Sequence, residues 1–402
     1  MVLKPQKTFI KKMPKIPKVI LLIENSREPG RGVLRGIAKY SFLRGPWTFY
    51  TKPPFYFNPV RSKKELISQM KEFDPDGIIT RDSEDVTEIA ARGVPAILFN
   101  AIKPVTTELP SIFTDDYAIG KMAAEHLLDR GFTQFAFCGF YNIPWSVARS
   151  KAFSKRIAQA GLKTYLYKIS KSQSKLSWSK ERLLLADWLK KLPKPLGLMA
   201  CNDDRAQQAA EACKIAGLHI PEQVAIIGVD NDDMVCNLTN PQLSSIAVGW
   251  ERAGYEAAEL LDKLMAGKEK MKNPLIKVEP LYPVARQSTD ILAIEDTDIA
   301  KAVRFIRQHC KEPIRVDDVV AAAALSRRIL EKRFRKILGR SILCEIRRVR
   351  VEQIVRMLIG TNLPISQIAP SLGYPGVDHI ARYFRKEKAM TPLAYRKKFG
   401  SK

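Results

Sequence analysis

The chain has 402 residues and a formal net charge of +25, which allows two or three domains with sizeable cores and favours a polyanionic partner. Its six cysteines form no Cys-x-x-Cys pair and none has a histidine at metal-ligand spacing, so the sequence predicts neither a metal site nor a cofactor. Scattered cysteines suit a reducing compartment, and no stretch reaches transmembrane length, so we expect a cytoplasmic protein without a membrane segment.

Residues 1–17 form a lysine-rich arm with three prolines. The arm lacks the apolar core and the small-residue cleavage site of a secretory signal. The first apolar run after it, 19–23, is only as long as a strand. We therefore expect a disordered, solvated arm ahead of the first domain.

From residue 18 to residue 288, short apolar stretches alternate with amphipathic ones. The predicted strands are 19–23, 47–50, 77–79, 96–99, 111–114, 134–138, 164–167, 197–200 and 224–229, with a last one at 278–284. The predicted helices between them are 32–40, 64–71, 117–130, 150–160, 178–190 and 203–216. This alternation predicts an α/β domain with parallel sheets covered by crossover helices on both faces. Because so many units exceed one sheet, we expect two lobes.

Polar side chains follow five of these predicted strands, at the edge where parallel sheets bind ligands. The candidate ligand-binding residues are Asn25, Arg27, Asp115, Asp116, Trp145, Arg149, Asn202, Asp203 and Asp230. Carboxylate, amide and guanidinium groups pair with sugar hydroxyls, and an aromatic ring covers the apolar side of a sugar. Any single Asp or Asn could instead cap the helix that follows it. Their concentration at one edge predicts a small-sugar site between the lobes.

Several segments of this region resemble the effector domain of LacI/GalR repressors. They include TDDYAIGKMAAEHLLDRGF (114–132), CNDDRA (201–206) and GLHIPEQVAIIGVDNDD (217–233). The resemblance implies the fold of periplasmic sugar-binding proteins. It also implies that Arg149, Asn202, Asp203 and Asp230 hold sugar hydroxyls.

Residues 289–297 form a short junction that is not rich in glycine or serine, so we expect it to transmit orientation to the domain that follows. Thr297 or Asp298 can cap the next predicted helix, 299–310. Residues 297–402 carry 24 Lys and Arg against nine Asp and Glu, a net charge of +15. An anionic membrane is the competing partner, but the basic residues alternate with a patterned helical core, which favours nucleic acid.

Two helix–turn–helix patterns, 316–336 and 365–386, follow one another in the last domain, 298–402. In the first, Leu330 and Phe334 share an apolar face and the basic residues point elsewhere. The hydroxyl of Ser326 can cap this helix. In the second pattern, Pro370 removes a backbone donor, so we expect a shortened or bent helix there. A basic helix that projects from a compact helical pair fits a major groove of DNA.

The same stretch resembles the AraC-type DNA-binding domain, most clearly in SRRILEKRFRK (326–336), RYFRK (382–386) and TPLAYR (391–396). The resemblance and the helical periodicity agree on which residues face DNA. Arg328, Lys332, Asp378 and Arg382 are expected at base edges. Phosphate contacts are expected from Arg335, Lys336, Arg385 and Lys386, and Arg327 is a further DNA-binding candidate.

A LacI-type effector domain followed by an AraC-type domain resembles the order found in xylose-operon regulators. The resemblance implies a sequence-specific transcription regulator, an activator of pentose catabolism genes, that binds D-xylose or a similar sugar. Its expected partners are promoter DNA, a second copy of the chain and RNA polymerase. The loop after the first predicted strand, ENSREPGRGVLRG, shares little sequence with those regulators, so the identity of the sugar stays open.

Two other functions stay open on the sequence alone. One is a DNA-binding protein, activator or repressor, that answers to a non-pentose ligand or whose lobed domain only dimerises. The other is a carbohydrate enzyme with a basic tail. Because the sequence contains no nucleophile motif, phosphate-binding loop or metal cluster, we predict that the protein is not an enzyme.

Overall fold

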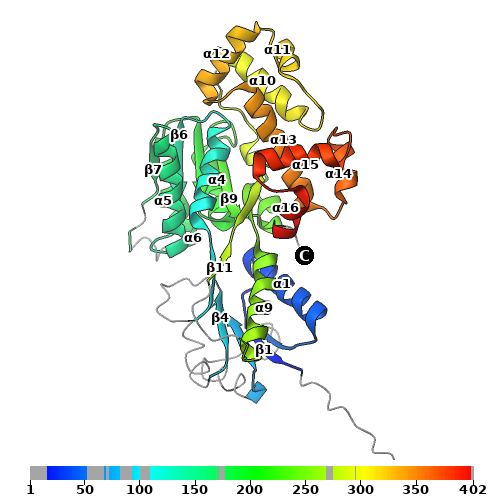
Figure 1. The fold of residues 1–402 in the computed structure, drawn as a ribbon. Helices are drawn as coiled ribbons and strands as arrows, with labels where there is room; N and C mark the ends of the chain where they lie inside the picture. Colours follow the sequence, from blue (N-terminus) through cyan, green and yellow to red (C-terminus); the bar gives the residue numbers. More distant parts are fainter. Residues whose placement is uncertain are drawn as a thin grey trace, which may run out of the picture.

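The computed structural model comprises two α/β lobes and a C-terminal helical domain (Figure 1). It describes residues 16–51, 68, 72–81, 93–99, 109–168, 170–171, 177–268, 275–294 and 296–399. The arm predicted at 1–17 therefore lies outside the described residues except for its last two, and so does the helix predicted at 64–71 except for residue 68. The predicted class, two lobes with mostly parallel sheets plus an all-α domain, is confirmed.

The first lobe is built on a parallel sheet of six strands in the order β11–β5–β4–β3–β1–β2. The strands are β1 (Lys18–Leu22), β2 (Thr48–Thr51), β3 (Gly77–Thr80), β4 (Ala96–Phe99), β5 (Ser111–Thr114) and β11 (Leu275–Val278). Helices α1 (Glu28–Arg44) and α9 (Trp250–Met265) pack on each other beside this sheet (Figure 1). Their backbones approach so closely that a Cβ on Gly36 would stand 1.9 Å from the carbonyl oxygen of Glu251, so only glycine fits there.

The second lobe is a six-stranded sheet in the order β12–β10–β9–β8–β6–β7, in which only β12 runs antiparallel to its neighbour. The strands are β6 (Gln134–Cys138), β7 (Thr164–Leu166), β8 (Leu196–Ala200), β9 (Val224–Asp230), β10 (Ser244–Val248) and β12 (Pro280–Val284). Its helices are α4 (Asp116–Leu128), α5 (Pro144–Gln159), α6 (Trp178–Lys191), α7 (Asp203–Ala216) and α8 (Asp233–Leu238). Strand β8 is buried along its whole length, as expected of a parallel strand covered on both faces.

The chain passes between the lobes three times, at Asp115, Gly249 and Glu279. The three crossings lie side by side. The backbone N–H of Asp115 donates to the carbonyl of Val278 (2.9 Å), and that of Gly249 donates to the carbonyl of Glu279 (3.2 Å). Short adjacent crossings of this kind form a hinge about which two lobes can close on a ligand.

The C-terminal domain consists of helices with two hydrophobic cores. The helices are α10 (Thr297–Gln308), α11 (Val316–Ala323), α12 (Arg327–Leu338), α13 (Ile342–Gly360), α14 (Ile365–Ser371), α15 (Val377–Lys388) and α16 (Pro392–Phe399). Leu330 and Phe334 of α12 lie in the first core, and Ile380 and Phe384 of α15 lie in the second. Helix α13 contributes to both cores, so it joins the two helix–turn–helix units into one body.

Three predictions about individual residues in the helices of this domain have different outcomes. Asp296, and not Thr297 or Asp298, caps α10, because its carboxylate accepts from the backbone N–H groups of residues 298 and 299. Ser326 stands at the start of α12, but its hydroxyl makes no capping hydrogen bond. Pro370 lies inside α14, which has only seven residues, as the missing backbone donor predicts. The strands β10 and β11 were not predicted.

Ala324 ends α11 in the left-handed region, with φ 53°. Since alanine has a Cβ that is crowded in this region and glycine does not, we expect Ala324→Gly to raise the stability of the domain by roughly 0.5–1 kcal/mol. Ala321→Gly, inside the same helix, should lower it by a similar amount. Thermal unfolding measures both changes. A loss of stability in Ala324→Gly would contradict the argument.

Candidate functional site

A cavity of about 150 Å³ lies between the two lobes. Six of the predicted ligand-binding residues line it, namely Arg27, Trp145, Arg149, Asn202, Asp203 and Asp230. Because the carboxyl ends of parallel strands gather at one edge of each sheet, residues that are far apart in sequence converge here. A cavity of about this volume holds one six-membered ring, which suits a monosaccharide better than a longer saccharide.

Arg149 is deeply buried in the wall of the cavity, with 2% of its surface exposed. Its Nε donates to the Asp116 carboxylate (2.9 Å) and its Nη1 donates to the carbonyl of Cys201 (2.6 Å). The guanidinium also lies over the ring of Trp145, 5.0 Å from the ring centroid. These contacts fix the guanidinium in place before any ligand arrives, which reduces the ordering cost of binding.

Asp203 and Asp230 stand side by side at the second-lobe wall. The Asp203 carboxylate accepts from the Ser245 hydroxyl (2.6 Å) and from the backbone N–H of Asp232 (2.7 Å), so both of its oxygens are used within the protein. Burial and the neighbouring charge of Asp230 raise the pKa of Asp203 well above its usual range. Asp203 therefore lines the cavity and also links β10 and the start of α8 to α7.

Asp230 lines the cavity and has an unsatisfied hydrogen-bond acceptor. Its Oδ1 is shut off from solvent and has no hydrogen-bond partner. Its backbone has φ 99°, a conformation that a non-glycine residue adopts only when the surrounding structure enforces it. Burial raises the pKa of Asp230 to about 6, although the charge of Arg149 opposes the rise. The end of β9 therefore carries a buried oxygen whose capacity to accept a hydrogen bond is unused within the protein.

The remaining predicted residues lie off the cavity wall. Asp115 caps α4 by accepting from the backbone N–H of Ala118 (3.0 Å), and its other oxygen pairs with Lys277 (2.6 Å). Asp116 lies behind Arg149 and pairs with it. Asn25 is exposed and is not brought to the wall.

Asn202, by contrast, lines the cavity and also caps α7, as the simpler interpretation of such residues predicts.

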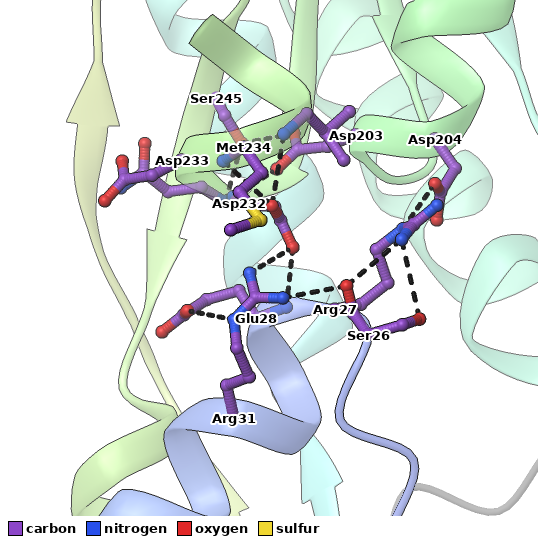
Figure 2. A network of polar contacts seen from close by, with 12 residues as sticks. Ser26, Arg27, Glu28, Arg31, Asp203, Asp204, Asp232, Asp233, Met234 and Ser245 are labelled. Carbon is purple, nitrogen blue, oxygen red and sulfur yellow. Dashed lines mark hydrogen bonds and ion pairs between the residues drawn. The ribbon is translucent and has the colours of Figure 1, made fainter. Parts of the chain in front are cut away.

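A network of ion pairs joins the lobes at the mouth of the cavity (Figure 2). Arg27 Nε donates to the Asp204 carboxylate (2.7 Å), and Arg31 Nη2 donates to the Asp232 carboxylate (2.7 Å). The same oxygen of Asp232 accepts from the backbone N–H of Glu28 (2.7 Å). Since Arg27, Glu28 and Arg31 belong to the first lobe and the two aspartates to the second, these contacts stabilise a closed arrangement.

Sequence reasoning missed Arg31, Arg81 and Asp204. Arg81 directly follows β3, so the strand-end argument that found the other residues could have found it too. Arg31 and Asp204 lie inside the first turns of α1 and α7, where the sequence carries no signal that they meet across the cleft.

Helix α4 connects the cavity with the C-terminal domain. Its first residue, Asp116, bonds Arg149, and the residue after its last turn, Asp129, faces the helical domain. The two oxygens of the Asp129 carboxylate pair with Arg340 (2.7 Å) and Arg348 (2.8 Å). The Asp129 carbonyl accepts from Arg307 Nη2 (3.1 Å). One helix therefore touches the candidate ligand site at one end and the helical domain at the other.

The predicted DNA-facing residues lie on the exposed faces of two separate helices, α12 and α15. They are all exposed, namely Arg327, Arg328, Lys332, Arg335, Asp378, Arg382 and Arg385. The opposite faces of these helices hold the buried residues of the two cores. Arg327 pairs with Asp317 (3.1 Å), an exposed and therefore weak ion pair that DNA phosphates can replace.

The described part of the chain contains no group of histidine, cysteine and acidic residues that could hold a metal ion. All six cysteines are free thiols. No helix in the described ranges has the length and apolar character needed to span a membrane.

Comparison with known proteins matches both domains. Residues 124–289 match a periplasmic binding protein-like domain, and residues 319–398 match a helix-turn-helix domain. The xylose operon regulatory protein of Escherichia coli (strain K12) is 30% identical over 391 residues, which cover 94% of this chain and 96% of that protein. The Haemophilus influenzae protein of the same name is 29% identical over 388 residues, covering 94% and 98%. A solved structure of a xylose-binding transcription activator, xylR, matches with a TM-score of 0.59 and 29% identity, covering 96% of this chain and 99% of that one.

Proposed function

Because the chain belongs to the family of xylose operon regulatory proteins, a family of DNA-binding transcription regulators with a sugar-binding effector domain, we propose that it activates pentose catabolism genes in response to a small sugar. The observation that carries this proposal is the cavity between the lobes, in which Arg149 is fixed and Asp230 lacks a partner. D-xylose or a sugar of similar size is the proposed ligand class, and the similarity to the xylose operon regulatory protein and to the xylose-binding activator of known structure supports it.

In this proposal the sugar binds between the lobes and adds to the ion pairs that hold them closed. Closure then acts on the helical domain through α4, which meets Arg149 at one end and Arg340 and Arg348 near the other. If the protein binds sugar and DNA with different affinities in the two arrangements of α4, binding of one changes the affinity for the other. The free energy of such coupling is typically about 1–3 kcal/mol.

Asp129→Asn tests this route. Burial raises the pKa of Asp129 against the opposing charges of Arg348 and Arg340, so a neutral amide should fold there at small cost. We expect the variant to bind sugar as the parent protein does and to bind promoter DNA, but with the roughly 5–150-fold effect of sugar on DNA affinity reduced to near one. DNA binding measured with and without sugar gives the ratio. An unchanged ratio would remove α4 from the mechanism.

We propose that α12 and α15 enter successive major grooves of the promoter, roughly 34 Å apart, with Arg328 and Lys332 at base edges of the first. Arg328→Ala should then cost about 1–3 kcal/mol at a specific site and much less on random DNA. Fluorescence anisotropy with both duplexes measures the difference. An equal loss of affinity for both duplexes would make Arg328 a phosphate contact. Lys301→Ala, which removes a positive charge from an exposed face of α10, is the control for net charge.

The regulator is proposed to act as a homodimer in the bacterial cytoplasm, bound to the nucleoid at its promoters, where an activator contacts RNA polymerase. Thermal unfolding of the full chain against a panel of pentoses and hexoses, D-xylose included, tests the sensing role. A ligand that binds only the folded state raises the unfolding temperature. If no sugar shifts the transition, the rival function, a regulator without a sugar effector, would account for the chain better.

A further inference from the structure

Arg81 occupies an unusual position on the first-lobe wall of the cavity. Its Nε is sealed from solvent and has no hydrogen-bond partner. Within the ranges that the structure describes, its guanidinium also forms no ion pair. A guanidinium keeps its charge at all physiological pH values, so an unpartnered donor of this kind is costly to bury unless a ligand supplies the acceptor.

The other arginines around the cavity are matched by carboxylates. Arg27 pairs with Asp204 (2.7 Å), Arg149 with Asp116 (2.9 Å), and Arg31 at the mouth with Asp232 (2.7 Å). Figure 2 shows two of these pairs, which bring first-lobe arginines to second-lobe aspartates. Arg81 thus differs from the other arginines of the wall, because no carboxylate of the described residues lies within ion-pair distance of its guanidinium.

The other unpartnered polar groups of the cavity wall indicate which hydrogen-bond donors and acceptors the ligand must provide. Trp145 Nε1 is also sealed without an acceptor, whereas Asp230 Oδ1 is sealed without a donor. Glu24 lines the cavity as well, and its Oε1 already accepts from the backbone N–H of Ser26 (2.7 Å). Because Glu24 is exposed, water and salt screen its repulsion of an anion. The ligand therefore needs acceptor oxygens near Arg81 and Trp145, and a hydroxyl donor for Asp230.

We propose that the ligand is a sugar acid of about pentose size, whose carboxylate is held by Arg81 and whose hydroxyls are held by Asp230. A planar carboxylate matches the guanidinium fork in two parallel hydrogen bonds, which a single sugar hydroxyl cannot do. This inference rests on the proposed sugar-sensing function and narrows it.

Isothermal titration of the full chain with D-xylonate and its neutral counterpart D-xylose tests the proposal. A second matched pair, D-glucuronate and D-glucose, compares an acid and a neutral sugar that are both rings. In one of the pairs the acid should bind about tenfold or more tightly than the neutral sugar, as expected for hydrogen bonds to a charged group. Arg81→Gln should bring the two affinities of that pair together, and Arg81→Lys should keep part of the preference.

Lys190→Gln, an exposed position on α6, removes one positive charge far from the wall residues and should leave the preference intact. Thermal unfolding verifies that the Arg81 variants are folded. A preference for the neutral sugar in both pairs, or an acid preference that survives in Arg81→Gln, overturns the proposal. If neutral pentoses bind and acids do not, the proposed sugar sensing stands and only this inference fails. If neither class binds, both fail.

Discussion

Replacing Arg149 with methionine is expected to abolish the response to sugar. Methionine keeps most of the apolar stem but removes the fork that Asp116 and Cys201 hold in place. Two hydrogen bonds from a charged group to a ligand are together worth roughly 3–6 kcal/mol, so sugar affinity should fall at least about a hundredfold. Calorimetric titration measures the loss, and the sugar-induced shift in thermal unfolding should disappear with it.

The same substitution also leaves the Asp116 carboxylate without its partner, which should destabilise the lobed domain by about 3–5 kcal/mol. Arg149→Met with Asp116→Asn separates the two effects. The double variant should regain much of the stability, because no unpaired charge remains, but it should not regain sugar binding. Sugar affinity close to that of the parent protein in either variant would refute the role of Arg149.

Glu345→Gln is expected to be the most destabilising single change in the helical domain. Glu345 is fully buried at the start of α13, and its oxygens accept from Arg348 (2.8 and 2.9 Å) and from Arg340 (2.6 Å). Removing the carboxylate leaves two half-buried guanidinium groups, Arg340 and Arg348, with fewer acceptors, which should cost about 3 kcal/mol. Chemical denaturation followed by far-ultraviolet circular dichroism measures the loss.

The pH dependence of stability gives a second measurement of the same group. Burial alone would raise the pKa of Glu345, but the hydrogen bonds and charges of Arg348 and Arg340 outweigh it and lower the pKa to about 2. A carboxyl group whose pKa is lower in the folded state than its usual 4.5 stabilises the fold fully above pH 4.5 and loses that contribution as the pH falls toward 2. This loss should amount to about 3 kcal/mol and should be absent in Glu345→Gln.

Glu352→Gln is the matched control, because Glu352 contacts the same arginine, Arg348, but is partly exposed. Exposed ion pairs contribute little, so this variant should lose less than about 1 kcal/mol. Equal losses in the two glutamate variants would mean that net charge, and not the buried contacts of Glu345, sets the stability of the domain.

The sequence by itself determined the architecture of this protein and the position of most of its candidate site. Alternating apolar runs predict parallel strands because both faces of such a sheet are buried. The helical spacing of Leu330 with Phe334 and of Ile380 with Phe384 predicts which faces of α12 and α15 are buried. Strand ends converge at one edge in this fold, so the sequence could place Arg149 and Asp230 together, and the structure shows both in the wall of the cavity between the lobes.

Only the tertiary structure decided which polar groups of the candidate site keep free hydrogen-bonding atoms and which are bonded within the protein. Asp115 and Asp203 look like Asp230 in sequence, yet the first caps a helix and the second has both oxygens bonded internally. The ion pairs across the cleft and the contact of Asp129 with the helical domain could not be predicted from the sequence either. They join residues far apart in the chain, and the local pattern of a sequence carries no information about which side chains meet when separate elements pack.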